Sequence, residues 1–596
     1  MQTLTSAASI TKRKQACSSC RHRKKRCDGE RPTCSLCRKW GIQCEYAVPA
    51  ANKSAEQSEI PSFPRPFFDA QAALPFNLVQ MQDAMLNFLP FPDNNNNNID
   101  SSSLAIDPTL EQATGYPTPS SEQPIDGTVN IDDSFSIDSG LPSDTVLIEL
   151  INIFFDHSST HFPCFHKQNL IRQVQNHQMQ TASPIVLRAI CITAARHHSD
   201  PEIRARRNDW FSTARLEYEL SPRIPIQPVR TLQAAALLLT YAYTIGDFSF
   251  AWLVLGKAWR QMCALGFNRL DSEQGSASTF DLPEHHPDTL LETEELRRTL
   301  WLLFIIDRSH TWPTGWPHAI DERQFKVDIP IADEYFQAMS LHTIDSIQSP
   351  TPFTRHLNKL ISSSHIPTES VNMFHYLVVA HVILGRITEQ IHSPHNSPDS
   401  PEYAQECNDL DSCIVKFRLS IPRVATSALE SSPEHREQAI WLNTSLNLMA
   451  MLLNYRCTKL GDQEESPEQF FRVIVAARNT AQMLKDASRI SVDFLLSPHI
   501  ASAFYIAACV LVVQWRMTGE DSFKEDADLF TLLFDRFNDV FEFIGLKFRL
   551  ALDHDMERTM DSIHELREKG FKGLMSDCSK WRHVQQTVAQ KGIYIT

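Results

Sequence analysis

The sequence predicts an all-α protein in which a small cysteine-rich module precedes a large helical region. Only 17 of the 596 residues are glycine, and long stretches contain no turn signal, which favours helices over a β-sandwich or barrel. Hydrophobic residues make up 42% of the chain, enough for a large buried core. The length exceeds what one compact core usually needs, so more than one domain is expected.

Composition divides the chain into four zones. Residues 1–16 form a basic polar arm, and residues 17–46 hold six cysteines. Residues 47–145 combine 14 acidic residues with only 2 basic ones and contain many prolines, which predicts a disordered acidic linker and a candidate activation region. Residues 146–580 are patterned as helices and form the expected regulatory domain.

The formal charge of −15 is unevenly distributed. Residues 1–50 contain 11 Lys and Arg against 3 Asp and Glu, a net charge of +8, so the rest of the chain carries −23. A small basic head on a large acidic body predicts that the head binds a polyanion such as nucleic acid.

Apolar residues recur at helical spacing in two segments of the large region. One stripe consists of Trp252, Leu255, Trp259 and Met262, with Gly266 as a helix stop. The other consists of Leu296, Leu300, Leu303 and Phe304, ahead of the break at Pro313–Pro317. Both stripes are interpreted as core packing.

Neither a secretory signal nor a membrane span is expected. Residues 1–10 are polar, and the longest apolar stretch, 500–513, is shorter than the roughly 18–20 residues that a span needs. Clustered cysteines inside a cell indicate a metal more often than disulfides. The eight cysteines outside the cluster are predicted to be buried core thiols.

Six cysteines repeat one pattern twice. Each half reads Cys-x2-Cys-x6-Cys, and the halves are offset by 17 residues. The ligands are Cys17, Cys20, Cys27, Cys34, Cys37 and Cys44. Because a closed zinc site takes four ligands, six thiolates serve one zinc with two to spare, or two zincs that share two sulfurs. The repetition favours two Zn2+ ions bridged by one cysteine from each half.

This cluster resembles that of the fungal zinc binuclear cluster transcription factors. The match covers Ala16–Cys44 and includes the spacings, the basic run RHRKKR after Cys20, and Pro32 before Cys34. The resemblance implies that Cys17 and Cys34 bridge the two zincs, and that Pro32 is the family's loop proline, often cis. It also implies a nuclear DNA-binding regulator of RNA polymerase II genes.

The basic run is the expected contact with double-stranded DNA. Most of its charges should touch phosphates, because sequence-independent contacts dominate such interfaces. By the family resemblance, Arg23 and Lys24 are the base readers, with Lys24 favoured, on a CGG-type half-site. Arg38 and Lys39 in the second half are expected to grip the DNA backbone. The predicted DNA-binding residues are Arg21, Arg23, Lys24, Lys25, Arg26, Arg38 and Lys39.

Dimerisation through a coiled coil directly after the cluster is not expected. Residues 45–75 contain four prolines and no heptads, so the protein either binds DNA as a monomer or forms a homodimer through the helical body. The segment Phe76–Leu89, apolar at helical spacing between two prolines, is a candidate helix for docking on a partner or on the body.

The helical body carries a second resemblance, to the middle homology domain of fungal transcription factors. It rests on Phe162–His166, on AWLVLGKAWRQMCALGFNR at 251–269, and on ELRRTLWLLFIIDRSHTWPTGWP at 295–317 followed by 327–330. Trp316 stands where the family usually has arginine. In the family this region regulates the activator. The polar residues Arg297, Arg298, Asp307 and Arg308 are interpreted as a structural network rather than a ligand site.

An enzyme, or a zinc module for protein contacts, is a remote alternative. The groups Glu284–His286 and Asp553–Glu557 do not have a catalytic metal spacing, and the chain has no phosphate-binding loop or nucleophile elbow. We therefore expect a non-enzymatic regulator that acts with the transcription machinery or co-regulators and does not bind a membrane. It is expected to activate a metabolic or biosynthetic gene set; a repressor of the same architecture is the alternative.

Overall fold

The chain, seen in a computed structural model, is described at residues 17–22, 25, 27–44, 140–272, 287–340, 342, 348–364, 370–395, 400–455 and 467–591. It divides into two compact units, Met1–Phe76 and Asn77–Thr596. We call the described part of the first the cysteine unit (17–44) and that of the second the helical unit (140–591). The predicted arm, most of the acidic linker and the segment Phe76–Leu89 lie outside the described residues.

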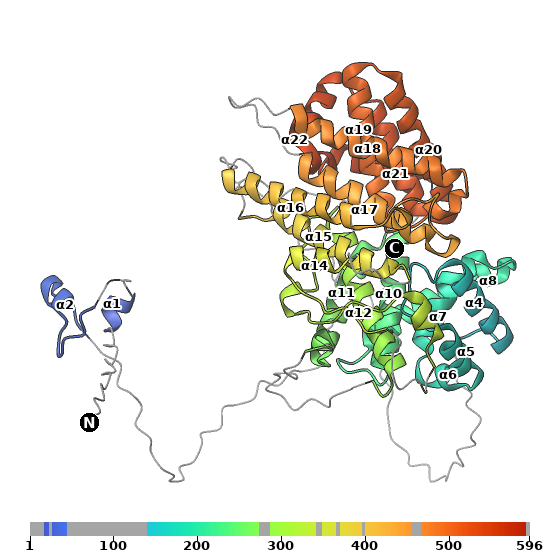
Figure 1. Cartoon of the computed structure of the whole chain (residues 1–596), viewed down its shortest axis with the longest axis horizontal. Helices are drawn as coiled ribbons and strands as arrows, with labels where there is room; N and C mark the ends of the chain where they lie inside the picture. The colour runs from blue at the N-terminus through green and yellow to red at the C-terminus, as the bar shows by residue number, and fades with distance from the viewer. Residues whose placement is uncertain are drawn as a thin grey trace, which may run out of the picture. The chain divides into compact units, whose positions relative to one another are not determined.

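The cysteine unit contains two short helices, α1 (Ser18–His22) and α2 (Ser35–Trp40), drawn in blue in Figure 1. Cys34 is the N-cap of α2. The helix ends at Gly41, whose φ of 60° lies in the left-handed region that glycine adopts without steric cost. The peptide bond between Arg31 and Pro32 is cis, as the family resemblance implied.

The helical unit consists of helices joined by short segments, and its described residues contain one isolated β-bridge, between Ile329 and Thr351. This confirms the predicted all-α fold class. The α-helices are α4 (Asp144–His157), α5 (Lys167–Gln175), α6 (Gln178–Ala182), α7 (Pro184–Ala194), α8 (Pro201–Ala205), α9 (Arg207–Leu220), α10 (Pro228–Ile245), α11 (Phe248–Ala264), α12 (Leu290–Thr311), α13 (Asp333–Ala338), α14 (Leu357–Ser363), α15 (Met373–His392), α16 (Pro401–Ser420), α17 (Arg436–Asn454), α18 (Pro467–Ser488), α19 (Ala501–Thr518), α20 (Asp521–Val540), α21 (Glu542–Met556), α22 (Met560–Met575) and α23 (Cys578–Gln590). Short 3-10 helices are η1 (Ala195–His197), η2 (Phe267–Arg269), η3 (Glu322–Gln324), η4 (Arg423–Ala425), η5 (Pro433–His435) and η6 (Val492–Leu495).

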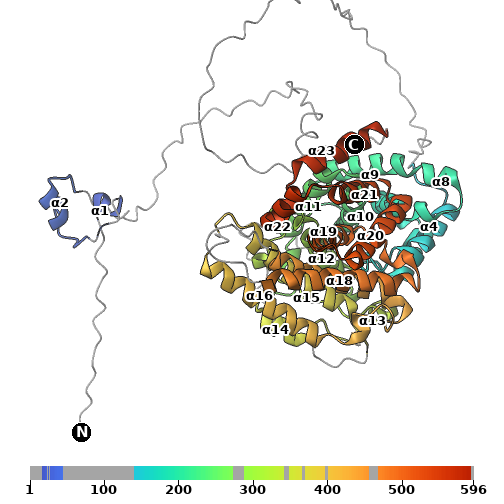
Figure 2. The same ribbon diagram turned by 90° about the horizontal axis from the view of Figure 1, so that it is seen from above.

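Three helices form the centre of the helical unit. Nearly every side chain of α10 and α12 is buried, and most of α19 is buried as well. Figure 2 places these three in the middle of the unit, with other helices around them. A helix that is apolar on nearly all sides must be enclosed by protein, as α10 and α19 are, whereas α12 buries charged side chains as well as apolar ones.

The packing of the helical unit connects its early and late helices. From α17 to α21 each helix packs on the next in the chain, and these orange and red helices gather at the top of the unit in Figure 1. α10 contacts both α7 and α21, so it joins the first helices of the unit to the last ones. Residues that are far apart in the sequence can therefore lie close together at this junction.

The second predicted helical stripe is confirmed in full and the first in part. The first lies on α11, where Leu255 and Met262 are buried, Trp252 and Trp259 are only half-buried, and Gly266 follows the helix with a positive φ of 75°. The second lies on α12, whose four stripe residues are all buried. α12 ends directly before the Pro313–Pro317 break.

The apolar stretch near residue 500 lies within a longer helix. It forms most of α19, an 18-residue helix that is long and apolar enough to cross a membrane by length and composition alone, so the expectation of a segment too short for a span does not hold for the whole helix. Within the helical unit, however, 72% of this helix window is buried against other helices. Burial of this kind is what the core helix of a globular domain shows.

Candidate metal centre and nucleic-acid interface

The two halves of the cysteine cluster have the same local geometry. In each half the thiol sulfur of the first cysteine accepts the backbone N–H of the second at 3.4 Å, from Cys20 to Cys17 and from Cys37 to Cys34. Five residues after the second cysteine, the backbone N–H of Lys25 or Ile42 returns to the carbonyl of Cys20 or Cys37 at 3.0 Å. The repeat in the sequence is thus a repeat in the structure.

The six sulfurs form two groups of four that share two members. One group contains Cys17, Cys20, Cys27 and Cys34, and the other contains Cys17, Cys34, Cys37 and Cys44. Within each group all sulfurs lie within 4.8 Å of one another. Cys17 and Cys34, the residues that the resemblance named as bridges, are common to both groups.

The sulfur spacing fits zinc. A zinc–sulfur bond is about 2.3 Å, so two thiolates on one tetrahedral zinc lie about 3.8 Å apart. The Sγ–Sγ distance is 3.8 Å from Cys17 to Cys34, 3.6 Å from Cys20 to Cys34 and 3.7 Å from Cys17 to Cys37. Cys20 and Cys37, which belong to different groups, are also close, at 3.9 Å. The cluster therefore offers the donor type and separation that a tetrahedral zinc site needs.

Burial and local hydrogen bonds shift the pKa values of the cluster thiols in different directions. The backbone N–H of Cys37 lowers the pKa of Cys34, whereas burial raises the pKa of Cys37 to about 12 and raises the pKa of Cys20 as well. A metal that replaces the protons would hold such thiols as thiolates, because only the deprotonated form is a ligand.

Side chains outside the ligand set brace the cluster, and sequence reasoning missed them. The carboxylate of Asp28 accepts the backbone N–H of Ser35 at 3.2 Å and also its hydroxyl, which fixes the start of α2. The Ser19 hydroxyl donates to the carbonyl of Gln43 at 2.7 Å. Each bond joins one half of the cluster to the other. The sequence showed only that Asp28 can accept hydrogen bonds, and it did not show that Ser35, seven residues later, is the donor.

The predicted DNA-binding residues are described only in part. Arg21 lies on α1, but its side chain, together with Arg23, Lys24 and Arg26, falls outside the description. Lys25, Arg38 and Lys39 are exposed, with Lys25 following α1 and the other two in the last turn of α2. Arg38 donates to the carbonyl of Thr33 at 3.1 Å and lies 3.7 Å from Glu30. An exposed pair of this kind is weak and can be exchanged for a phosphate contact.

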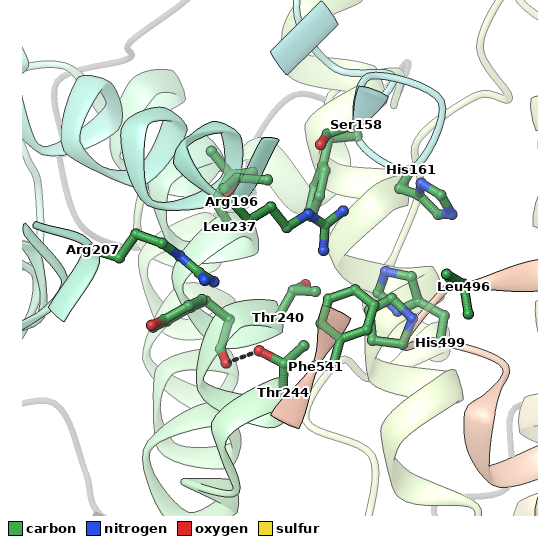
Figure 3. A pocket seen from close by; sticks show the side chains of 14 residues that line it. Ser158, His161, Arg196, Arg207, Leu237, Thr240, Thr244, Leu496, His499 and Phe541 are labelled. Atoms are coloured by element: carbon green, nitrogen blue, oxygen red, sulfur yellow. Dashed lines mark hydrogen bonds between the residues drawn. The ribbon is translucent and has the colours of Figure 1, made fainter. Parts of the chain in front are cut away.

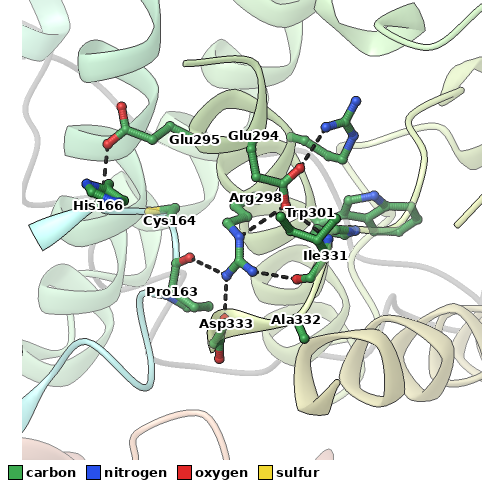
Figure 4. Close-up of polar contacts among 12 residues, drawn as sticks. Pro163, Cys164, His166, Glu294, Glu295, Arg298, Trp301, Ile331, Ala332 and Asp333 are labelled. Carbon is green, nitrogen blue, oxygen red and sulfur yellow. Dashed lines mark hydrogen bonds and ion pairs between the residues drawn. The ribbon is translucent and has the colours of Figure 1, made fainter. Parts of the chain in front are cut away.

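The charged residues of α12 form a buried network that holds three segments together (Figure 4). Arg298 is fully buried, and its guanidinium donates to the carbonyls of Pro163 at 3.0 Å and Ile331 at 2.5 Å. It also meets the carboxylates of Glu294, at 3.2 Å, and Asp333. Two carboxylates and two backbone carbonyls thus accept from the guanidinium, which supports the structural interpretation of this residue.

The neighbouring charged residues of α12 are also paired with charged groups of the protein. Arg297 pairs with both Glu294 and Asp271 at 2.7 Å. Arg308 pairs with Asp307 at 2.5 Å, and the Asp307 carboxylate also accepts the backbone N–H of Ile320 at 2.9 Å. Buried charges persist when they are paired and hydrogen-bonded in this way.

Trp316 stands at the position where the family usually has arginine. Its ring packs in a tilted arrangement against the ring of Trp252, with centroids 5.2 Å apart.

The remaining cysteines only partly match the prediction that they are core thiols. Cys164, Cys191, Cys407 and Cys509 are buried, Cys413 and Cys578 are half-buried, and Cys457 lies outside the described residues. Cys263 is exposed, so for it the prediction was wrong. It lies one residue after the buried Met262 on α11 and faces away from the core, which the residue type alone does not reveal.

Of the two metal-like groups that the sequence offers in the helical region, the one within the described residues does not gather further metal-ligating side chains. The stretch Asp553–Glu557 places Asp555 in ion pairs with Arg558, at 2.7 Å, and Lys580, at 3.3 Å. Glu284–His286 lies outside the described residues. Among the residues that are described, the close groups of metal-ligating side chains are the two cysteine sets.

Comparison with known families assigns both units. Residues 15–53 match the "Fungal Zn(2)-Cys(6) binuclear cluster domain", and residues 151–414 match the "Fungal specific transcription factor domain". The cysteine ligands and the α12 network fall inside these two matches. No solved structure matches the chain.

Curated relatives are distant but similar over long stretches. A "Zn(2)-C6 fungal-type transcription factor FTF1c" from Fusarium oxysporum f. sp. lycopersici is 22% identical over 80% of this chain and 54% of its own length. The "Citrinin biosynthesis transcriptional activator" proteins mrl3 of Monascus ruber and ctnR of Monascus purpureus are each 22% identical over 54% of this chain, and over 64% and 57% of their own lengths. The chain thus spans less than two thirds of each of these relatives.

A zinc cluster domain of this class implies both zinc binding and DNA binding. The two domain matches and the relatives describe transcription factors rather than enzymes. The chain therefore carries a fungal Zn(2)-Cys(6) binuclear cluster domain followed by a fungal-specific transcription factor domain, and the relatives that it resembles are fungal Zn(2)-C6 transcription factors.

Proposed function

We propose that this protein is a nuclear, sequence-specific transcription regulator that holds two zinc ions and reads a CGG-type half-site. The observation that carries the metal part is that the two four-sulfur groups share Cys17 and Cys34. Six thiolates can close two four-coordinate sites only if two of them are shared. In the proposal Cys20 and Cys27 complete one site, and Cys37 and Cys44 complete the other.

The two halves of the cluster differ in the charge that follows each helix, and this supports a division of labour on DNA. With the offset of 17 residues, the basic residues 23–26 of the first half correspond to Trp40, Gly41, Ile42 and Gln43 of the second. Only in the first half is the helix followed in the sequence by a run of cations. We therefore assign base reading to Lys24, with Arg23 beside it, and backbone contacts to the flanking positions Arg38 and Lys39.

A DNA selection with the purified, zinc-loaded full chain tests the half-site. We expect the bound sequences to contain CGG triplets, and Lys24→Ala to relax the preference for guanine at one position at a cost of about 1–3 kcal/mol in binding. Lys39→Ala is the matched control, because loss of a phosphate contact should weaken specific and random DNA alike. Equal losses on both DNAs for Lys24→Ala would remove it as a base reader.

The regulatory sign is proposed from the relatives and from composition. The two Monascus relatives are named as activators of citrinin biosynthesis, which supports activation of a biosynthetic gene set here. Residues 47–145, with 14 acidic and 2 basic residues, have the composition of an activation region that recruits co-regulators. Fused to a heterologous DNA-binding domain, this segment should activate a reporter of RNA polymerase II transcription. Silence or repression there would favour the repressor alternative.

A further inference from the structure

A cavity lies where the early and late helices of the helical unit meet (Figure 3). It contains about 480 Å³ of space between atoms, including the part open to solvent. Its walls come from the turn after α4, from η1, from the start of α9, from α10, and from two late segments around residues 496–499 and 541. The family match ends at residue 414, so the late segments lie beyond it.

Two arginines point into this cavity without a carboxylate partner. Figure 3 shows the guanidinium groups of Arg196 and Arg207 turned toward the same space. Their Nε atoms are used, in contacts with His197 at 2.8 Å and with the carbonyl of Ile192 at 3.2 Å. In the described part of the chain no carboxylate oxygen lies within 4.0 Å of either guanidinium.

Two neighbouring arginines, one on α7 just before η1 and one on α9, behave differently. Arg188 on α7 pairs with Glu217 at 2.5 Å, and Arg215 on α9 pairs with Asp247 at 2.7 Å. The fold therefore supplies a carboxylate both to the buried guanidinium of Arg188 and to the half-buried guanidinium of Arg215. Two cations that face each other without one leave a position where an anion would be stabilised.

The charges around the cavity are consistent with a position that stabilises an anion. Burial and then the charge of Arg207 lower the pKa of Arg196 to about 10, so the two cations oppose each other. The acidic group on this side, Glu437, is already engaged by the hydroxyl of Thr160 and lies 3.6 Å from the Nδ1 atom of His161. It does not bridge the two arginines.

Two further polar side chains of the lining have no hydrogen-bond partner. The Ser158 hydroxyl is buried and unpaired, with 2% of the residue exposed. Both ring nitrogens of His499 are buried and unpaired, and 5% of that residue is exposed. The His499 ring stacks on Trp441 at 4.8 Å, which fixes its plane. Unpaired buried polar atoms are costly, and a bound ligand would satisfy them.

The rest of the wall combines apolar side chains, with Phe162, Leu237, Leu496 and Phe541 among them, and the side chains of three threonines, a tyrosine and a histidine. We propose that the cavity binds a small organic carboxylate with an apolar body. Its carboxylate would lie between Arg196 and Arg207, where bidentate guanidinium contacts are strong, and its body would lie against the apolar part of the wall. Because the lining joins early and late helices, bound ligand would stabilise the whole helical unit.

Calorimetric titration and thermal unfolding of the zinc-loaded full chain test this site. The probes are benzoate and hexanoate, with benzamide as a neutral match of benzoate in shape and inorganic phosphate as an anion without an apolar body. We expect saturable binding of both carboxylates, a higher unfolding temperature of the helical unit, and no comparable effect of benzamide or phosphate. Absence of saturable binding by either carboxylate, or equal binding of benzamide, would overturn the proposal.

Variants locate the site. Arg196→Gln and Arg207→Gln should each weaken benzoate binding at least about tenfold, as expected for loss of a charge-assisted hydrogen bond. Arg207→Lys, which keeps the charge, should retain part of the affinity and guards against misfolding of the glutamine variant. Arg582→Gln, which removes an exposed charge of the same unit outside the cavity lining, is the control. Unchanged affinity in both glutamine variants would contradict the assignment.

Discussion

The cysteine unit and the helical unit are built around different kinds of core. In the described residues of the cysteine unit the buried apolar cluster consists of Cys17, Cys20, Cys34 and Cys37. The helical unit instead buries one large cluster of aliphatic and aromatic side chains that runs from α4 to α23. The first core is made of metal-ligating atoms, and the second is made of hydrocarbon.

This difference teaches which force holds each unit. A hydrophobic core stabilises in proportion to the apolar area that it removes from water, so the helical unit needs no metal. A segment as short as the cysteine unit cannot bury enough apolar surface and depends on metal ligation for its fold. The two units should therefore respond differently to the same treatments.

Metal removal is expected to give the largest difference. Chelation of zinc should unfold the cysteine unit, because structural zinc contributes on the order of 10–16 kcal/mol to small zinc domains. The helical unit should keep its helices. Limited proteolysis should then cleave within residues 17–44, while far-UV circular dichroism changes little.

Two outcomes of that experiment would break the comparison. Protease resistance of residues 17–44 after complete zinc removal would mean that the cysteine unit folds without metal. Loss of most helical signal would mean that the helical unit also depends on it. Re-addition of zinc should restore protection if the loss was specific.

Disruption of the α12 network should affect only the helical unit. Arg298→Met leaves the carboxylates of Glu294 and Asp333 and the carbonyls of Pro163 and Ile331 without their shared donor. Removal of one partner from a buried ion pair costs about 3–5 kcal/mol. The midpoint of urea unfolding should fall accordingly, and zinc content should not change.

A matched arginine provides the control for this prediction. Arg323 also pairs with an aspartate, Asp321, at 3.0 Å, but 72% of its side chain is exposed. Arg323→Met should change stability by less than about 1 kcal/mol, as exposed pairs usually do. If the two variants lost similar stability, burial would not be what makes the α12 network matter.

The ring pair of Trp316 and Trp252 should give the smallest effect. Its centroids are 5.2 Å apart, and such pairs are worth about 0.5–1.5 kcal/mol beyond their buried area. Trp316→Leu, Trp252→Leu and the double variant form a cycle whose coupling energy, from urea unfolding, should fall in that range. A coupling energy near zero would show that the two rings do not stabilise each other, so the tryptophan at position 316 would not contribute a ring contact in place of an arginine.

Sequence patterns predicted the local features of both units because those features depend on neighbours in the chain. The repeat of the cysteines predicted the matching halves, and the apolar stripe from Leu296 to Phe304 predicted a buried α12. The sequence predicted that Arg297 and Arg298 take part in a structural polar network, but it did not predict their partners Asp271 and Asp333. Those contacts join residues 26 and 35 positions apart, and no local pattern encodes them.

Exposure and cavities were the other features that the sequence did not predict. Cys263 is exposed because of its position on the α11 surface, although its residue type is usually buried. The cavity of Arg196 and Arg207 depends on segments up to 383 residues apart, since its lining runs from Ser158 to Phe541. Such sites arise from tertiary packing and are visible only in the folded chain.

Zinc bound per chain, measured in the wild type and in single-cysteine variants, tests the central claim most directly. Sharing of Cys17 and Cys34 predicts two zinc ions in the wild type, one in Cys44→Ser, and loss of both in Cys34→Ser. Cys263→Ser, an exposed thiol outside the cluster, should keep two. One zinc in the wild type, or equal loss in Cys34→Ser and Cys44→Ser, would contradict the shared-cysteine arrangement.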